Sequence, residues 1–167
     1  MGGRLLTILI ATAAWLALPG GSPELARDVD FVRMLKSERR LELLAQGQVV
    51  RRYSIALGGN PVGRKYFEGD RRTPEGRYVL DWRNAGSCCV RLLHISYPNA
   101  ADTAAAAKKG RPPGGMIMIH GPPNRLAAFD WLLQMSDWTD GCIAVSRAEM
   151  LEIWDMVANG TPIEIDP

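Results

Sequence analysis

Two short segments, each with a glycine beside a reactive side chain, constrain most strongly how this chain can fold. In residues 116–120 the alternating side chains predict a β-strand, and the strand should end at His120 because Gly121 and two prolines follow. Farther along, Gly141 directly precedes Cys142, which leads into a short apolar run. A glycine before a thiol leaves the backbone open to close approach. The two segments therefore predict a sheet edge at which an imidazole and a thiol meet.

A cysteine with a histidine in reach is the minimal equipment for acyl transfer through a thiolate. On this hypothesis Cys142 is the nucleophile and His120 is its proton acceptor and donor. The backbone N–H groups of Gly141 and Cys142 would face the developing oxyanion. The competing interpretation is structural, since a lone cysteine in an apolar run is often buried packing and a lone histidine is often a satisfied polar residue.

The same residues resemble the active-site signature of the L,D-transpeptidases, the YkuD-type catalytic domain. That signature is a histidine followed downstream by Ser/Thr-x-Gly-Cys, which matches His120 and residues 139–142. Further segments resemble the family in the family's order, so the resemblance covers residues 30–166. These segments are residues 56–59, 68–78, 94–99 and 160–165.

The resemblance implies a fold and a reaction. The implied fold is a β-sandwich of mixed sheets with the cysteine and histidine beneath a flap. The implied substrate is a peptidoglycan tetrapeptide stem, cleaved between its diamino acid and the terminal D-Ala. The acyl group passes to an amine on a neighbouring stem or on a lipoprotein, in cell-wall cross-linking or remodelling. Two alternatives stay open: an L,D-carboxypeptidase or endopeptidase that transfers the acyl group to water, and a non-catalytic wall-binding module.

Other residues are candidates for binding the substrate. His94 and Tyr97 match a family strand near the pocket, although packing roles fit them equally well. The backbone of Gly121 is expected to line the site. Thr139 is expected to hydrogen-bond around His120, with purely local turn bonds as the alternative.

Charged residues supply a second group of candidates. Arg125 is a candidate for attracting acidic stems, and so is a basic loop group. The basic loop group consists of Arg64, Lys65, Arg71 and Arg72. Asp140 and Ala144 stand where the family often has His and Arg, which puts in doubt how substrate carboxylates are held. We expect Asp140 to point outward, because an inward carboxylate would raise the pKa of the neighbouring thiol.

The order of the predicted elements favours a mainly β domain with a few helices, an α+β arrangement on an antiparallel or mixed sheet. Strands come first and helices gather late. Strands are expected at residues 30–36, 40–45, 48–57, 77–82, 90–96, 116–120 and 163–165. Three helices are expected: one at residues 99–109, one of about ten residues capped by Asn124, and one that follows a Ser146–Glu149 capping box.

Length and charge limit the remaining possibilities. A chain of 167 residues has room for one such domain, and a net charge of +2 gives no indication of nucleic-acid binding. The apolar stretch of residues 5–18 follows Arg4, which predicts a signal peptide or short anchor over residues 1–22. Export to the periplasm or cell envelope follows, with membrane contact only through an uncleaved leader.

The three cysteines do not suggest a metal site. No cysteine or histidine spacing matches zinc ligation, and no cofactor is expected. Cys88 and Cys89 are adjacent, so a mutual bridge would be strained. We expect them to be strand residues whose side chains face opposite sides of a sheet.

Overall fold

The computed structural model describes residues 29–167, so the predicted leader at residues 1–22 lies outside the described part. Within this part no helix is long and apolar enough to cross a membrane. The elements are β1 (Phe31–Leu35), β2 (Arg40–Ala45), β3 (Gln48–Ser54), β4 (Gly76–Asn84), β5 (Leu92–Ile95), α1 (Ala100–Ala107), β6 (Met118–His120), the 3₁₀ helix η1 (Asn124–Phe129), α2 (Asp130–Leu133), β7 (Ile143–Ala144), α3 (Arg147–Met156) and β8 (Thr161–Asp166).

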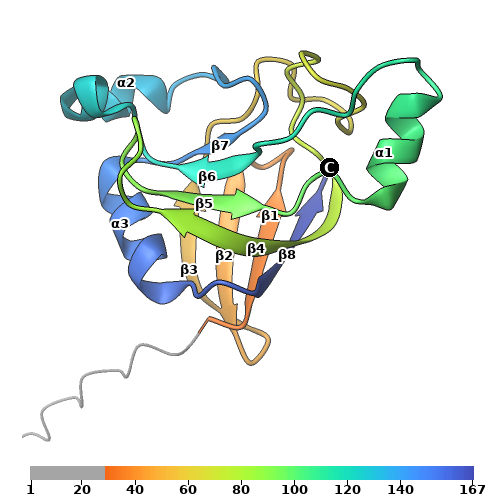
Figure 1. The fold of residues 1–167 in the computed structure, drawn as a ribbon. Coiled ribbons are helices and arrows are strands. Elements are labelled where there is room, and N and C mark those ends of the chain that lie inside the picture. Colours follow the sequence, from red (N-terminus) through yellow and green to blue (C-terminus); the bar gives the residue numbers. More distant parts are fainter. Residues whose placement is uncertain (1–28) are drawn as a thin grey trace, which may run out of the picture.

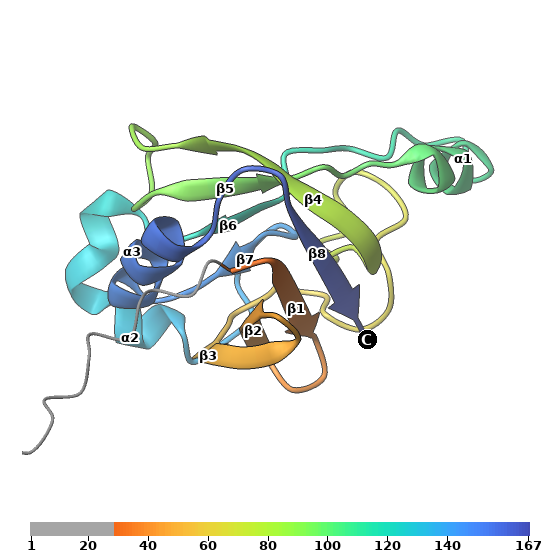
Figure 2. The same ribbon diagram turned by 90° about the horizontal axis from the view of Figure 1, so that it is seen from below.

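All eight strands belong to one sheet in the order β3-β2-β1-β8-β4-β5-β6-β7. The pairs β1–β8 and β6–β7 are parallel and the other pairs are antiparallel, so the sheet is mixed. The sheet curls until β1–β3 lie opposite β4–β6 (Figures 1 and 2). An isolated bridge between Ala56 and Ala144 joins the chain after β3 to the edge strand β7. The predicted class, mainly β with a few helices on a mixed sheet, is confirmed.

The core lies inside this curl because alternate strand residues point inward. Val32 on β1 pairs with Ile163 on β8, and each is 1% exposed. Ile119 on β6 pairs with Ile143 on β7, and both are fully buried. Burial of one such side chain contributes about 1.5–3 kcal/mol, so the alternation holds each strand in its register.

Two of the predicted helix starts are confirmed and one is wrong. Asn99 caps α1 and Ser146 caps α3, each within a complete capping box. Asn124 does not cap a helix: its side-chain amide donates to the carbonyl of Ser87 at 3.0 Å, and the segment begins as the 3₁₀ helix η1. The side chain of Asn124 therefore makes a tertiary hydrogen bond in place of the helix cap that the local sequence predicts.

Two strand predictions also differ from the structure. Strand β6 begins only at Met118, because Met116 has φ of 56° and cannot continue an extended strand. Cys88 and Cys89 lie in the loop between β4 and β5 rather than on a strand. Their Sγ atoms are 3.6 Å apart, so they do not face opposite sides of a sheet.

Candidate active site

The parallel edge pair β6–β7 brings the predicted thiol and imidazole to one face of the sheet. Ile119 pairs with Ile143 and His120 with Ala144, a register that sets Cys142 beside Met118. The isoleucines point into the core, and side chains alternate along a strand. Cys142 and His120 therefore share the opposite face, on adjacent strands and one diagonal step apart.

The thiol of Cys142 is partly exposed and lies against backbone groups of β6 and the residues before it. Its Sγ is 3.6 Å from the carbonyl oxygen of Met116. Burial raises the pKa of Cys142, the backbone N–H of Met118 lowers it, and the nearby carboxylate of Asp140 raises it. The net direction is upward, so the resting group at neutral pH is a thiol and needs a base.

The imidazole of His120 is held in its neutral form. Its Nδ1 is 2.7 Å from the carbonyl oxygen of Gly121, and because a carbonyl only accepts, Nδ1 carries the proton. Nε2 is then the acceptor. Burial lowers the pKa of His120, and the hydrogen bond to Gly121 opposes that shift only in part. The ring of Trp138 meets the imidazole edge-on, with centroids 5.8 Å apart.

The turn before Cys142 is tightly packed and internally bonded. Gly141 has φ of 128°, and a Cβ there would lie 2.7 Å from the carbonyl oxygen of Arg72, so only glycine fits without strain. The N–H of Gly141 donates to Thr139 Oγ1 at 3.1 Å, and that hydroxyl donates to the carbonyl of Cys142 at 2.7 Å. The Gly141 amide thus already has an acceptor. Among residues 29–167 no protein group accepts a hydrogen bond from the N–H of Cys142.

Thr139 and Tyr97 make structural contacts. The bonds of Thr139 Oγ1 are local to the turn, which matches the alternative reading of this residue. Tyr97 is 3% exposed, its hydroxyl donates to the carbonyl of Pro113 at 3.0 Å, and its ring packs edge-on against Tyr78. Tyr97 is therefore a core residue that shapes the segment leading to β6.

His94 and Gly121 lie closer to the pair. His94 on β5 pairs with Met118 and so shares the face of Cys142. Gly121 is buried, and a Cβ there would lie 2.7 Å from the carbonyl oxygen of Val90. The sequence predicted only that the backbone of Gly121 lines the site. In the structure its carbonyl also orients His120. The sequence signal for this contact is the end of the strand at His120, because the carbonyl of the next residue is then not used in the sheet and can bond to the imidazole.

The charged candidates divide into free and paired groups. Arg125 is exposed on η1, and its role stays a prediction. Asp140 points outward as expected, with a 93% exposed side chain that contacts Arg71 at 3.4 Å. Lys65 is not a free loop cation: it is 3% exposed and bound to Asp70 at 2.8 Å. Arg64 is likewise paired, with Asp102 at 2.9 Å.

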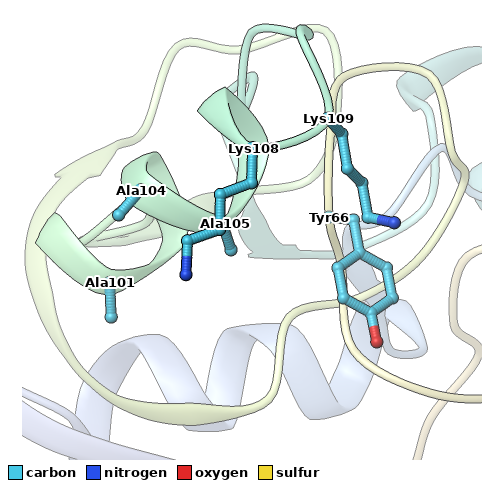
Figure 3. Close-up of a pocket in the computed structure, with 6 residues that line it drawn as sticks. All are labelled: Tyr66, Ala101, Ala104, Ala105, Lys108 and Lys109. Atoms are coloured by element: carbon cyan, nitrogen blue, oxygen red, sulfur yellow. The ribbon is translucent and has the colours of Figure 1, made fainter.

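A separate groove of about 560 Å³ lies along α1 (Figure 3). Three alanines of the helix form one wall, and Lys108 lies beside them. Lys109 completes the lining with its Nζ 4.8 Å from the ring centroid of Tyr66. Neither Cys142 nor His120 lines this groove.

The family follows from a match over nearly the whole described chain. Residues 29–165 match the L,D-transpeptidase catalytic domain, YkuD. The chain belongs to this family. It is 32% identical over 98 residues to the putative L,D-transpeptidase YafK of Escherichia coli K12, a match that covers 54% of this chain and 37% of YafK.

Solved structures show the same fold. The helical cell shape determining protein Pgp2 from Campylobacter jejuni aligns with a TM-score of 0.62 at 26% identity, over 82% of this chain and 47% of Pgp2. An L,D-transpeptidase from Xylanimonas cellulosilytica aligns with a TM-score of 0.52 at 20% identity, over 81% of this chain and 59% of that one. The chain thus spans less than half the length of YafK and of Pgp2.

Proposed function

We propose that this L,D-transpeptidase-family domain is an active cysteine acyltransferase on peptidoglycan stems. The observation that carries the proposal is the shared face of Cys142 and His120 at the β6–β7 edge. Family membership supports peptidoglycan as the substrate, and the cell envelope is where family members act on it. Export through the leader at residues 1–22 is part of the proposal.

The chemistry begins from a neutral pair. The pKa of Cys142 is raised and that of His120 is lowered, so the proton moves as the bond forms rather than beforehand. Nε2 of His120 takes the proton from Sγ as sulfur attacks the carbonyl between the diamino acid and D-Ala. The N–H of Cys142 donates to the oxyanion, and the Gly141 N–H joins only if it leaves Thr139.

Collapse of the tetrahedral intermediate completes the first half. The C–N bond breaks, and His120 returns its proton to the departing D-Ala amine. An acceptor amine, on a second stem or on a lipoprotein, then attacks the thioester while His120 takes its proton. Sulfur leaves, is reprotonated by His120, and the thiol is restored. With water as the acceptor the same steps give a carboxypeptidase or endopeptidase.

The sharpest test of the nucleophile is acylation by a carbapenem followed by intact mass. We expect one adduct on the parent protein, mapped to Cys142, and none on Cys142→Ser. The Cys88→Ser variant is the matched control and should still be acylated. An unmodified parent protein, or an adduct that survives in Cys142→Ser, would contradict the proposal.

A second experiment identifies the group that accepts the acyl chain from Cys142. Purified protein is incubated with tetrapeptide muropeptides, and the products are separated by mass spectrometry. Cross-linked dimers joined through the two diamino acids would identify a transpeptidase. Tripeptides alone would identify the hydrolase. Wall binding without any product, undiminished in Cys142→Ser, would identify the non-catalytic module.

A further inference from the structure

Two cysteines outside the proposed site form a dithiol in the loop between β4 and β5. Cys88 and Cys89 are both free thiols, with Sγ atoms 3.6 Å apart. Cys88 is exposed and Cys89 is partly buried. The side chains converge, although adjacent residues of a regular strand would diverge. Two thiols at this separation can be joined by a small rearrangement of the loop.

The dithiol is bonded to the segment that follows His120. The carbonyl of Cys88 accepts the backbone N–H of Asn124 at 2.9 Å, and Cys89 forms a β-bridge with Pro123. The next residue, Val90, donates its N–H to Pro122 at 3.0 Å and accepts the N–H of Gly121 at 3.0 Å. A backbone change at the dithiol is therefore passed to Gly121, whose carbonyl orients the catalytic imidazole.

The two thiols are not equivalent. Burial and the neighbouring Cys88 thiol raise the pKa of Cys89 to about 12. Because a thiolate is the attacking species, the exposed Cys88 is the better entering thiol and Cys89 the resolving one.

We propose that Cys88 and Cys89 are a thiol–disulfide exchange site that accepts a small-molecule disulfide and closes to a vicinal disulfide. The Cys88 thiolate attacks one sulfur of the oxidant; a mixed disulfide forms, and the first small thiol leaves with the proton lost by Cys88. Cys89, losing its proton, then attacks Cys88 Sγ and expels the second small thiol. Two protein thiols are oxidised, and one disulfide is reduced to two thiols.

Such a bridge would be easily reduced. Neighbouring Cα atoms are about 3.8 Å apart across a trans peptide, below the ~4.4 Å at which ordinary disulfides begin. Strained, exposed disulfides are the labile and regulatory ones. The site thus suits reversible modification rather than permanent cross-linking, in an oxidising compartment such as the envelope proposed above.

Peptide mapping tests the site without reference to activity. The parent protein is oxidised with glutathione disulfide, alkylated and cut with trypsin without reduction. Cleavage after Arg83 and Arg91 isolates residues 84–91 with both cysteines, and cleavage after Arg125 and Arg147 isolates Cys142 in residues 126–147. We expect residues 84–91 to be lighter by two hydrogens and unalkylated. Two alkyl groups or a lasting glutathione on this peptide, or its cross-link to residues 126–147, would overturn the proposal.

Single variants test the order of attack. Cys89→Ser should retain glutathione on Cys88, because the resolving thiol is missing. Cys88→Ser should remain mostly unmodified under the same conditions. The reverse pattern would overturn the assignment of the entering thiol.

The effect on Cys142 rests on the proposed function and is measured separately. Carbapenem acylation is followed by intact mass on the molecules that have lost two hydrogens and carry no glutathione. We expect acylation slower by on the order of tenfold than in reduced protein, since small displacements of a catalytic group are costly. The Cys88→Ser/Cys89→Ser double variant should show no such slowing. Equal rates in both forms would refute the coupling, whereas no acylation of reduced protein would refute the proposed function and leave the peptide result standing.

Discussion

The two histidines of this chain occupy the same face of neighbouring strands, yet their ring partners differ. His120 Nδ1 donates to the carbonyl of Gly121 at 2.7 Å. His94 Nδ1 lies 2.7 Å from the carboxylate of Asp81, and its ring stacks on Trp82 with centroids 4.6 Å apart. A carbonyl fixes one neutral tautomer, whereas a carboxylate also supports the imidazolium. On the function proposed above, His120 is the base, and we expect His94 to hold its position through Asp81 without taking part in the proton transfer.

Replacing each histidine in turn tests the difference between His120 and His94 with the largest expected effect. His120→Gln should slow carbapenem acylation of Cys142 by about 10²- to 10⁴-fold, the usual contribution of a general base. His94→Gln is the matched control and should stay within a few-fold of the parent. The rates come from intact mass against time. A larger loss in His94→Gln than in His120→Gln would reverse the assignment.

The pH profile sharpens the same contrast. Only the neutral imidazole accepts a proton, and burial lowers the pKa of His120, so the acylation rate should fall only below the ordinary histidine value of about 6.5. Below that pKa each pH unit should cost close to tenfold. His94→Gln should keep this acid limb, and His120→Gln should lack it. An acid limb centred above pH 6.5 in the parent would contradict the burial argument.

A substitution at Gly121 tests whether the carbonyl partner depends on packing. A Cβ on Gly121 would lie 2.7 Å from the Val90 oxygen and 2.8 Å from its Cβ, so Gly121→Ala should cost about 1–3 kcal/mol of unfolding free energy. It should also slow acylation by displacing His120. Gly115→Ala is the control, since its Cβ would meet nothing nearer than 3.9 Å. Urea unfolding of both variants measures the cost, and equal midpoints would show that the corner is not tightly packed.

The smallest effect on acylation and stability is expected from a substitution of Asp81. Asp81→Asn keeps an acceptor for His94 but removes the charge, and the Asp81 side chain is 40% exposed. Water screens such a pair, so stability should change by less than about 1 kcal/mol. The acylation rate should stay within about twofold. Loss of acylation here would mean that His94, through Asp81, takes part in the proton transfer.

Local sequence predicted most of the strands and two helix caps, because these depend on neighbours within a few residues. The alternation ending at His120 and the glycine before Cys142 identified the candidate pair. Predictions failed where a distant partner competes: Asn124 bonds to Ser87 instead of capping a helix. The prediction that Lys65 is a free loop cation is wrong for a similar reason. The folded loop buries Lys65 and brings it against the carboxylate of Asp70.

The sequence by itself determined the class of the fold through the periodicity of its strands and helices, and its motifs carried the resemblance to the family and pointed to the two side chains proposed for the chemistry. The tertiary structure decided the protonation and the surroundings of those side chains. The tautomer of His120, the engaged amide of Gly141 and the convergence of Cys88 with Cys89 all depend on which backbone groups lie opposite them. The physical reason is that hydrogen bonds and burial act over a few ångströms in space, and only folding brings distant residues within that range.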